Sequence, residues 1–357
     1  MVDPKSRRRS SARMMAAVLS FCFWCLSHPA QAAHSPEPPV GALQAQTVAS
    51  DPEPAESEAP SDQAAAWAGD CEAKDGEASD GEACRRLAYL YREGDGVAQD
   101  EVRAVWLFAR GCHLGDLTGC TMAGFAYGEG KGVELSHEKA ATYYAFACDG
   151  GEGTACSNLG LSYINGDGVP KDPKRAARLF KRSCELEDIS GCTNLGASYS
   201  LGKGLAPNQR EAARLFERAC QEDDQHACYN LGVLHRDALG MPRNYKRAYA
   251  LFEQSCEADE ASGCGNLAML IDDGRGVRRN RGRALELFDR ACDLGEAESC
   301  FSLARAYQTG KGIARDIAKA ILLLERTLEL DPDTKSAVSA RRALAEARGA
   351  EAAGSTP

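Results

Sequence analysis

Apolar and small residues recur along most of the chain at intervals of three, four and seven positions, which is the spacing of one face of an α-helix. Residues 156–192 contain two such amphipathic patterns, with a Gly-x-Gly loop between them and a C-x7-C cysteine pair at the end. This unit recurs with a period of 36 residues. A period of this length with helix–loop–helix content predicts an all-α solenoid of stacked helix pairs.

Three columns of residues define the inner face of the first helix in each unit. Counted from the second cysteine, the third residue is apolar, the fourth is Gly or Ala, and the seventh is usually Tyr. Glycine inside a helix costs up to about 1 kcal/mol, so we expect a neighbouring helix to approach closely at the small column. That column comprises Ala88, Gly124, Gly160, Gly196, Gly232, Ala268 and Ala304.

The second helix of each unit is predicted to follow the Gly-x-Gly loop and to begin at a polar N-cap. The expected N-caps are Asp100, Ser136, Asp172, Asn208, Asn244, Asn280 and Asp316. This helix carries an alanine column and, four residues later, large residues expected to fill the core: Phe108, Tyr144, Phe180, Phe216, Phe252, Phe288 and Leu324. The fifth unit departs from the pattern. Ala238 replaces its first glycine, and His235, which we expect to be half-buried, replaces its tyrosine.

The ends of the chain differ from the repeats in composition. Residues 1–32 combine a basic start, a short apolar run and an Ala-Gln-Ala motif, which predicts a signal peptide cleaved near Ala32. Residues 33–65 are rich in Pro, Ala, Glu and Ser and are expected to form a disordered acidic linker. The predicted solenoid occupies residues 66–348 and ends in a capping helix pair without cysteines, and residues 349–357 are expected to fray.

The charge balance limits the class of partner. The chain has a formal net charge of −10, and loss of residues 1–32 would remove five basic residues and Asp3, leaving −14. No nucleic-acid partner is expected for a chain this acidic. No membrane anchor is expected either, because no apolar run approaches the roughly 20 residues that span a bilayer.

The cysteine spacing predicts local disulfides. On one continuous helix, eight residues would separate two Cα atoms by about 12 Å, whereas a disulfide allows roughly 4.4–6.8 Å. The chain must therefore reverse within each polar, Gly-rich and acidic intervening segment. Zinc binding is the alternative, but zinc sites favour C-x2–4-C spacing. The expected bridges are Cys71–Cys84, Cys112–Cys120, Cys148–Cys156, Cys184–Cys192, Cys220–Cys228, Cys256–Cys264 and Cys292–Cys300, with Cys22 and Cys25 lost with the signal peptide.

The unit NLGxxYxxGxGVxxDxxKAxxLFxxAC resembles the Sel1-like repeat, a relative of the tetratricopeptide repeat. With C-x7-C in every unit, residues 71–345 closely resemble the secreted, disulfide-rich Helicobacter cysteine-rich protein (Hcp) family. The resemblance implies a right-handed α/α superhelix of about seven units with a concave face. Members of that family have been described as penicillin-binding proteins or weak β-lactamases, whereas the wider Sel1-like group consists mostly of adaptor proteins.

The sequence lacks most of the chemistry of a serine β-lactamase, which needs S-x-x-K together with S-D-N or Y-x-N and K-T-G. Ser136 and Ser200 each begin an S-x-x-K match, and residues 163–165 match Y-x-N, but there is no K-T-G or S-D-N. Both serines stand where the repeat itself explains them. The histidines form no H-E-x-x-H metal motif, and no catalytic residue is assigned.

These observations predict a periplasmic or secreted scaffold, monomeric, that binds a protein or peptide partner on its concave face. A surface that is rigid before binding loses little entropy on association. No cofactor and no metal ion are expected. The alternative, implied by the resemblance alone, is a weak β-lactamase or penicillin-binding protein that acts on β-lactams or cell-wall peptides.

Overall fold

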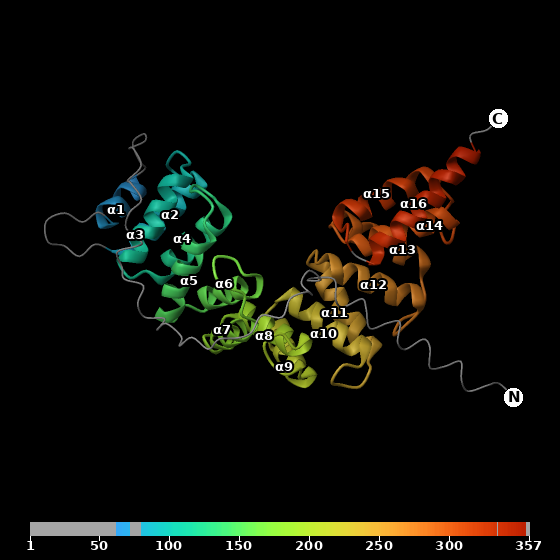
Figure 1. Cartoon of the computed structure of the whole chain (residues 1–357), viewed down its shortest axis with the longest axis horizontal. Helices are drawn as coiled ribbons and strands as arrows, with labels where there is room; N and C mark the ends of the chain where they lie inside the picture. Colours follow the sequence, from blue (N-terminus) through green and yellow to red (C-terminus); the bar gives the residue numbers. More distant parts are fainter. Residues whose placement is uncertain (1–61, 72–79, 334, 355–357) are drawn as a thin grey trace, which may run out of the picture. The chain divides into compact units, whose positions relative to one another are not determined.

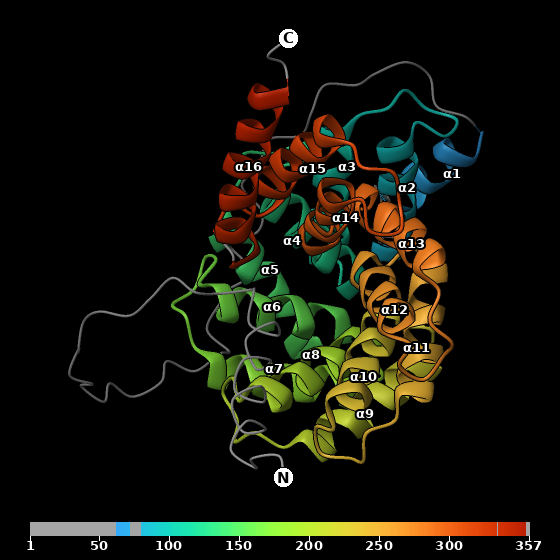
Figure 2. The same ribbon diagram turned by 90° about the vertical axis from the view of Figure 1, so that its right-hand side faces the viewer.

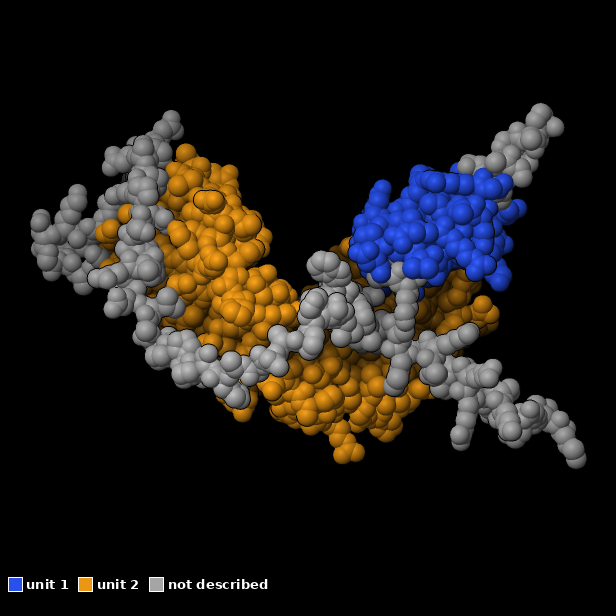
Figure 3. Space-filling view, viewed as in Figure 1, with its two compact units in different colours: residues 1–38, 295–357 blue, residues 39–294 orange. Residues whose placement is uncertain are grey.

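The structure is a computed structural model of the chain, and it describes residues 62–71, 80–333 and 335–354. The predicted signal peptide (1–32) and residues 33–61 of the predicted linker lie outside these described residues. Within them the chain forms sixteen α-helices and no strand, which confirms the all-α prediction (Figure 1). The chain divides into two compact units, residues 39–294 and residues 1–38 with 295–357 (Figure 3), which are described in turn.

The unit of residues 39–294 consists of one leading helix and six helix pairs, each helix packed against the next in chain order (Figures 1 and 2). We number the pairs as repeats 1 to 6. The helices are α1 (Asp62–Cys71); α2 (Gly81–Glu93) and α3 (Glu101–His113); α4 (Leu117–Glu129) and α5 (His137–Gly150); α6 (Gly153–Asn165) and α7 (Pro173–Glu185); α8 (Ile189–Leu201) and α9 (Gln209–Gln221); α10 (Gln225–Asp237) and α11 (Tyr245–Glu257); α12 (Ala261–Asp273) and α13 (Arg281–Asp293).

The core of each repeat is built from the columns that the sequence predicts. The apolar column of the first helices and the alanine and aromatic columns of the second helices are buried. A Cβ atom on Gly160 would lie 2.5 Å from Cε1 of Phe180, and one on Gly232 would lie 2.6 Å from Cε1 of Phe252. Glycine therefore stands in the first helix because the aromatic ring of the second helix rests directly on its backbone.

Each Gly-x-Gly loop ends one helix and touches the repeat before it. The first glycine is a left-handed C-cap, as at Gly202 (φ 68°), and the second also has positive φ, as at Gly204 (φ 76°). A Cβ atom on Gly204 would overlap the carbonyl oxygen of Pro173, at the start of the second helix of repeat 3. All seven predicted N-caps of second helices accept a hydrogen bond from a backbone N–H of the first turn.

Disulfides cross the turns between consecutive helix pairs. Five bridges of the C-x7-C type join the second helix of one repeat to the first helix of the next, and Cys71–Cys84 joins α1 to α2. Their Cα atoms lie 4.4–4.7 Å apart. Cys292 and Cys300 are disulfide-bonded as well. Cys22 and Cys25 lie outside the described residues.

The helical region begins earlier than the sequence predicts. Helix α1 starts at Asp62, so residues 62–65 belong to a helix and not to the linker expected over residues 33–65. Ala64 in this stretch is fully buried. This burial is tertiary packing, which the polar composition of the stretch does not reveal.

The unit that contains residues 295–357 has three described helices, α14 (Ala297–Thr309), α15 (Ile317–Leu330) and α16 (Lys335–Gly354). Helix α16 packs against α14 and α15, and Ser336, in the column of the second cysteine, donates a hydrogen bond of 2.6 Å to Glu298. The helix runs to Gly354, past the boundary at residue 348 expected from the sequence, because this Ala-rich stretch favours helix. None of the described helices has the length and apolar composition needed to cross a bilayer.

Candidate functional site

The first helices carry two further columns of side chains, which are exposed or half-buried except at Val233 and Asn266, where they are buried. An asparagine stands two residues after the second cysteine in repeats 3 to 6, at Asn158, Asn194, Asn230 and Asn266. Three residues further along each helix lies an apolar column formed by Phe125, Leu161, Ala197, Val233 and Met269. We call these nine residues the Asn face. Phe125 is 42% exposed, Leu161 40% and Met269 36%, so the apolar column presents side chains to solvent.

The four asparagine amides differ in their contacts. Asn194 donates from Nδ2 to Oγ of Ser157 at 3.1 Å. Asn266 donates to the carbonyl oxygen of Ser262 at 2.8 Å and accepts a hydrogen bond from Arg236. The side-chain amides of Asn158 and Asn230 make no hydrogen bond to the part of the chain that the structure describes. Their donors and acceptors are thus available to a ligand.

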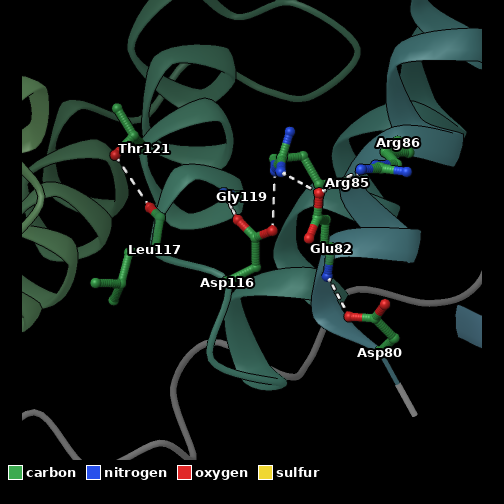
Figure 4. A network of polar contacts seen from close by, with 8 residues as sticks. All are labelled: Asp80, Glu82, Arg85, Arg86, Asp116, Leu117, Gly119 and Thr121. Carbon is green, nitrogen blue, oxygen red and sulfur yellow. Dashed lines mark hydrogen bonds and ion pairs between the residues drawn. The ribbon is translucent and has the colours of Figure 1, made fainter.

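A ladder of carboxylates sets the spacing between first helices. Asp116 is the N-cap of α4: it accepts a hydrogen bond of 2.6 Å from the backbone N–H of Gly119 and one of 2.9 Å from Nε of Arg85 in the preceding repeat (Figure 4). Thr121 donates to Glu152 at 3.0 Å in the same way. Four carboxylates both cap their own helix and bind the preceding repeat, which holds the Asn face in register: Asp116, Glu152, Asp188 and Asp224. Glu260 and Glu296 make no capping hydrogen bond through their side chains.

The sequence analysis missed this ladder, although a signal for it exists. An acidic residue stands four positions before every second cysteine of the described helix pairs. The column comprises Asp80, Asp116, Glu152, Asp188, Asp224, Glu260 and Glu296. The Asn column was equally readable, since Asn precedes Leu in four consecutive units.

Two histidines of repeat 5 have shifted pKa values. Nδ1 of His226 lies 2.9 Å from Oε2 of Glu260, and this hydrogen bond raises the pKa of His226 and lowers the pKa of Glu260. Burial, with a smaller effect of Arg247, lowers the pKa of His235. His235 is partly buried, as expected, and its Nδ1 is a buried atom without a hydrogen-bond partner among the described residues.

The irregular loop of repeat 5 lies beside a cluster of arginines. Arg236 pairs with both carboxylate oxygens of Asp237 and also donates to Asn266. The ring of Tyr245 has the guanidinium groups of Arg243 and Arg275 each 5.7 Å from its centroid. Ala238 takes the left-handed conformation (φ 61°) that glycine has in the other repeats.

The two serines of the S-x-x-K matches make structural contacts. Ser136 is the N-cap of α5 and accepts a hydrogen bond of 3.3 Å from the backbone N–H of Lys139. Ser200 lies in the last turn of α8 and donates to Oε1 of Gln209 at 3.2 Å. Tyr163, of the Y-x-N match, is buried. Within the described ranges, no group of three or more His, Cys, Asp and Glu side chains is placed to hold a metal ion.

Comparison with known families gives a match to the Sel1 repeat over seven segments: residues 81–116, 118–152, 153–188, 189–224, 225–260, 261–296 and 297–332. The chain belongs to the Sel1 repeat family. Each segment covers one helix pair, from α2 to α15, so the repeats recognised in the sequence are confirmed. The Sel1 repeat match assigns no catalytic family to the chain. A search of curated proteins gave no match.

Two solved structures share the fold. One is the Escherichia coli protein c5321, described as a protective antigen of uropathogenic strains with an SLR fold: it is 24% identical, covers 74% of this chain and has a TM-score of 0.59. The chain spans 56% of the length of that protein. The other is a Sel1 repeat protein of Oxalobacter formigenes, 23% identical over 68% of this chain and 96% of that one, with a TM-score of 0.61.

A third solved structure is cysteine rich protein B of Helicobacter pylori. It is 31% identical over 38% of this chain and 97% of its own length, with a TM-score of 0.31.

Proposed function

We propose that this Sel1 repeat protein is an extracytoplasmic scaffold that binds an extended polypeptide along its Asn face. The observation that carries the proposal is the recurrence of asparagine at one helical position in four consecutive repeats, with the amides of Asn158 and Asn230 unused among the described residues. A side-chain amide offers both a donor and an acceptor. It can therefore pair with the N–H and C=O groups that an extended peptide leaves free.

The surroundings of the asparagines suit such a ligand. The apolar column beside them offers contacts for the partner's side chains in repeats 2, 3, 4 and 6, whereas Val233 of repeat 5 is buried. First helices of neighbouring repeats also contact one another directly: α2 contacts α4, and α6 contacts α8. We infer that the stack curves toward the Asn face and makes this face concave. Disulfides and carboxylate caps hold this surface before binding, which reduces the entropy lost on association.

The compartment follows from the cysteines. Fourteen disulfide-bonded cysteines favour an oxidising environment. The signal peptide predicted over residues 1–32 points to the same place, namely the periplasm or the exterior of the cell. We propose that the mature scaffold acts there as a monomer, with no cofactor.

Peptides selected from a random library against the purified, oxidised protein test the proposal. We expect the double variant Asn158→Ala/Asn230→Ala to bind a selected peptide about ten- to a hundredfold more weakly, because each lost hydrogen bond is worth roughly 0.5–1.5 kcal/mol. Gln221→Ala/Gln254→Ala, which removes two amides from second helices, serves as the matched control and should bind normally. Unchanged affinity of the asparagine variant would overturn the proposal.

A further inference from the structure

The two edges of the unit of residues 39–294 differ in charge. Consecutive helices of this unit run antiparallel, so its Gly-x-Gly loops lie along one edge, the glycine edge, and its turns between bridged cysteines lie along the other, the disulfide edge. The five disulfide-edge turns of residues 39–294 contain twelve acidic residues and no Lys or Arg. These turns are residues 113–119, 149–155, 185–191, 221–227 and 257–263.

The charge of the glycine edge changes along the stack. We count charge over the nine residues that begin at the first-glycine position of each loop, which are 94–102, 130–138, 166–174, 202–210, 238–246 and 274–282. The net charges of these stretches in repeats 1 to 6 are −3, −1, 0, +2, +2 and +4. Residues 202–210, 238–246 and 274–282 contain eight basic residues and no acidic one. We call these eight residues the basic edge: Lys203, Arg210, Arg243, Lys246, Arg275, Arg278, Arg279 and Arg281. A chain with a net charge of −10 thus concentrates positive charge on one edge of three repeats.

Much of this positive charge is not neutralised. Arg281 and Arg279 share the carboxylate of Asp272, and Arg275 lies 3.2 Å from Asp273. Arg243 contacts the ring of Tyr245. Four further members of the basic edge have no ion-pair partner among the described residues: Lys203, Arg210, Lys246 and Arg278.

The basic edge continues into the Asn face. Arg236, in the last turn of α10, donates a hydrogen bond to Asn266 of the Asn face. In the same repeat, Tyr245 at the start of α11 has the guanidinium groups of Arg243 and Arg275 each 5.7 Å from its ring centroid. A polypeptide that lies on the Asn face of repeats 5 and 6 would therefore have the arginines of the basic edge within reach of its side chains.

We infer that the partner is an acidic polypeptide segment whose carboxylates contact the basic edge of repeats 4 to 6. The inference rests on the proposed function and names the class of partner. A polypeptide fits better than nucleic acid because the amides of the adjoining face suit a peptide backbone. Moreover, the acidic disulfide edge and the net charge repel a long, densely charged polyanion.

The test compares two fluorescent 16-residue peptides that share their apolar residues and carry Glu or Gln at every second position. Fluorescence anisotropy with the full-length oxidised protein should show at least tenfold tighter binding of the Glu peptide in 50 mM NaCl. In 500 mM NaCl we expect most of this difference to disappear, because salt screens exposed charges. A single-stranded oligonucleotide of 16 thymidines serves as the competing polyanion and should bind more weakly than the Glu peptide.

Replacing the four unpaired residues, as Lys203→Gln, Arg210→Gln, Lys246→Gln and Arg278→Gln together, should weaken binding of the Glu peptide about tenfold and leave the Gln peptide unaffected. A control removes the same charge from exposed positions of α7 and α9, as Arg178→Gln, Lys181→Gln, Arg182→Gln and Arg214→Gln, and should change neither affinity.

The inference would be overturned by equal affinity for both peptides, by no effect of the basic-edge substitutions, or by tighter binding of the oligonucleotide. Binding of neither peptide would also overturn it. None of these results affects the Asn-face test, which uses library-selected peptides, so the two proposals fail separately.

Discussion

The disulfide edge and the glycine edge reverse the chain equally often but by different means. On the disulfide edge a covalent bridge and a capping carboxylate close the turn, and its middle is open to solvent. The turn after repeat 2 has Gly151 at a position with positive φ. The corresponding residues after repeats 3, 4 and 5 also have positive φ, although they are Glu187, Asp223 and Asp259. On the glycine edge backbone hydrogen bonds close the loop, as from the N–H of Asn208 to the carbonyl oxygen of Tyr199 at 3.0 Å, and the second glycine packs against the preceding repeat. Covalent closure thus leaves the side chains of one edge free, whereas close packing requires glycine on the other.

The largest effect should come from adding one methyl group to the glycine edge. Gly204→Ala places Cβ against the backbone of Pro173, so we expect a loss of about 2–5 kcal/mol in the free energy of unfolding, measured with urea. Gly151 also has positive φ (100°), but a Cβ atom there would meet nothing within 4 Å, so Gly151→Ala should cost about 1–2 kcal/mol. Similar losses in both variants would show that the two edges do not differ as described.

Removing a covalent bridge should have the next largest effect. The double variant Cys220→Ala/Cys228→Ala loses a short closed loop, and loop-closure entropy predicts a loss of about 2–3 kcal/mol. Urea unfolding of the oxidised proteins measures the difference, and intact mass before and after reduction and alkylation establishes that the bridges exist. Free thiols in the protein purified without reductant would contradict the disulfide assignment.

The smallest effect should come from the ion pair between His226 and Glu260. The raised pKa of His226 means that its contribution is complete below its ordinary value of 6.5 and is lost as the pH rises through the raised value. The lowered pKa of Glu260 means that its contribution is complete above its ordinary value of 4.5 and is lost as the pH falls through the lowered value. The pair therefore stabilises most between pH 4.5 and 6.5, by no more than about 1 kcal/mol at this exposed site.

The variant His226→Gln checks this pH dependence. Above the raised pKa of His226, the free energy of unfolding of this variant should equal that of the parent protein. Between pH 4.5 and 6.5 the variant should be less stable than the parent protein. His113→Gln changes an exposed histidine in another disulfide-edge turn and serves as the control. If the two variants have the same pH profile, the ion pair contributes nothing measurable.

Sequence patterns predicted the elements of this fold well because each depends on nearby residues. Asp172 caps the helix that begins one residue later, and Gly160 meets a ring twenty residues away. The start of α1 and the end of α16 were placed less well, because burial at the ends of the stack depends on packing that no local motif records. The sites were harder still: the Asn column and the capping carboxylates show a clear period, but their roles depend on contacts between repeats.

The sequence by itself determined the period, which is read from the repetition, and also the helices, their caps and the expected cysteine pairs, since these involve residues of one helix or of two helices joined by a short turn. Only the tertiary structure decided which surface residues act together. Thr121 meets Glu152, and Arg236 meets Asn266, because stacking brings residues about 30 positions apart into contact. The same stacking aligns three separate loops into one basic edge.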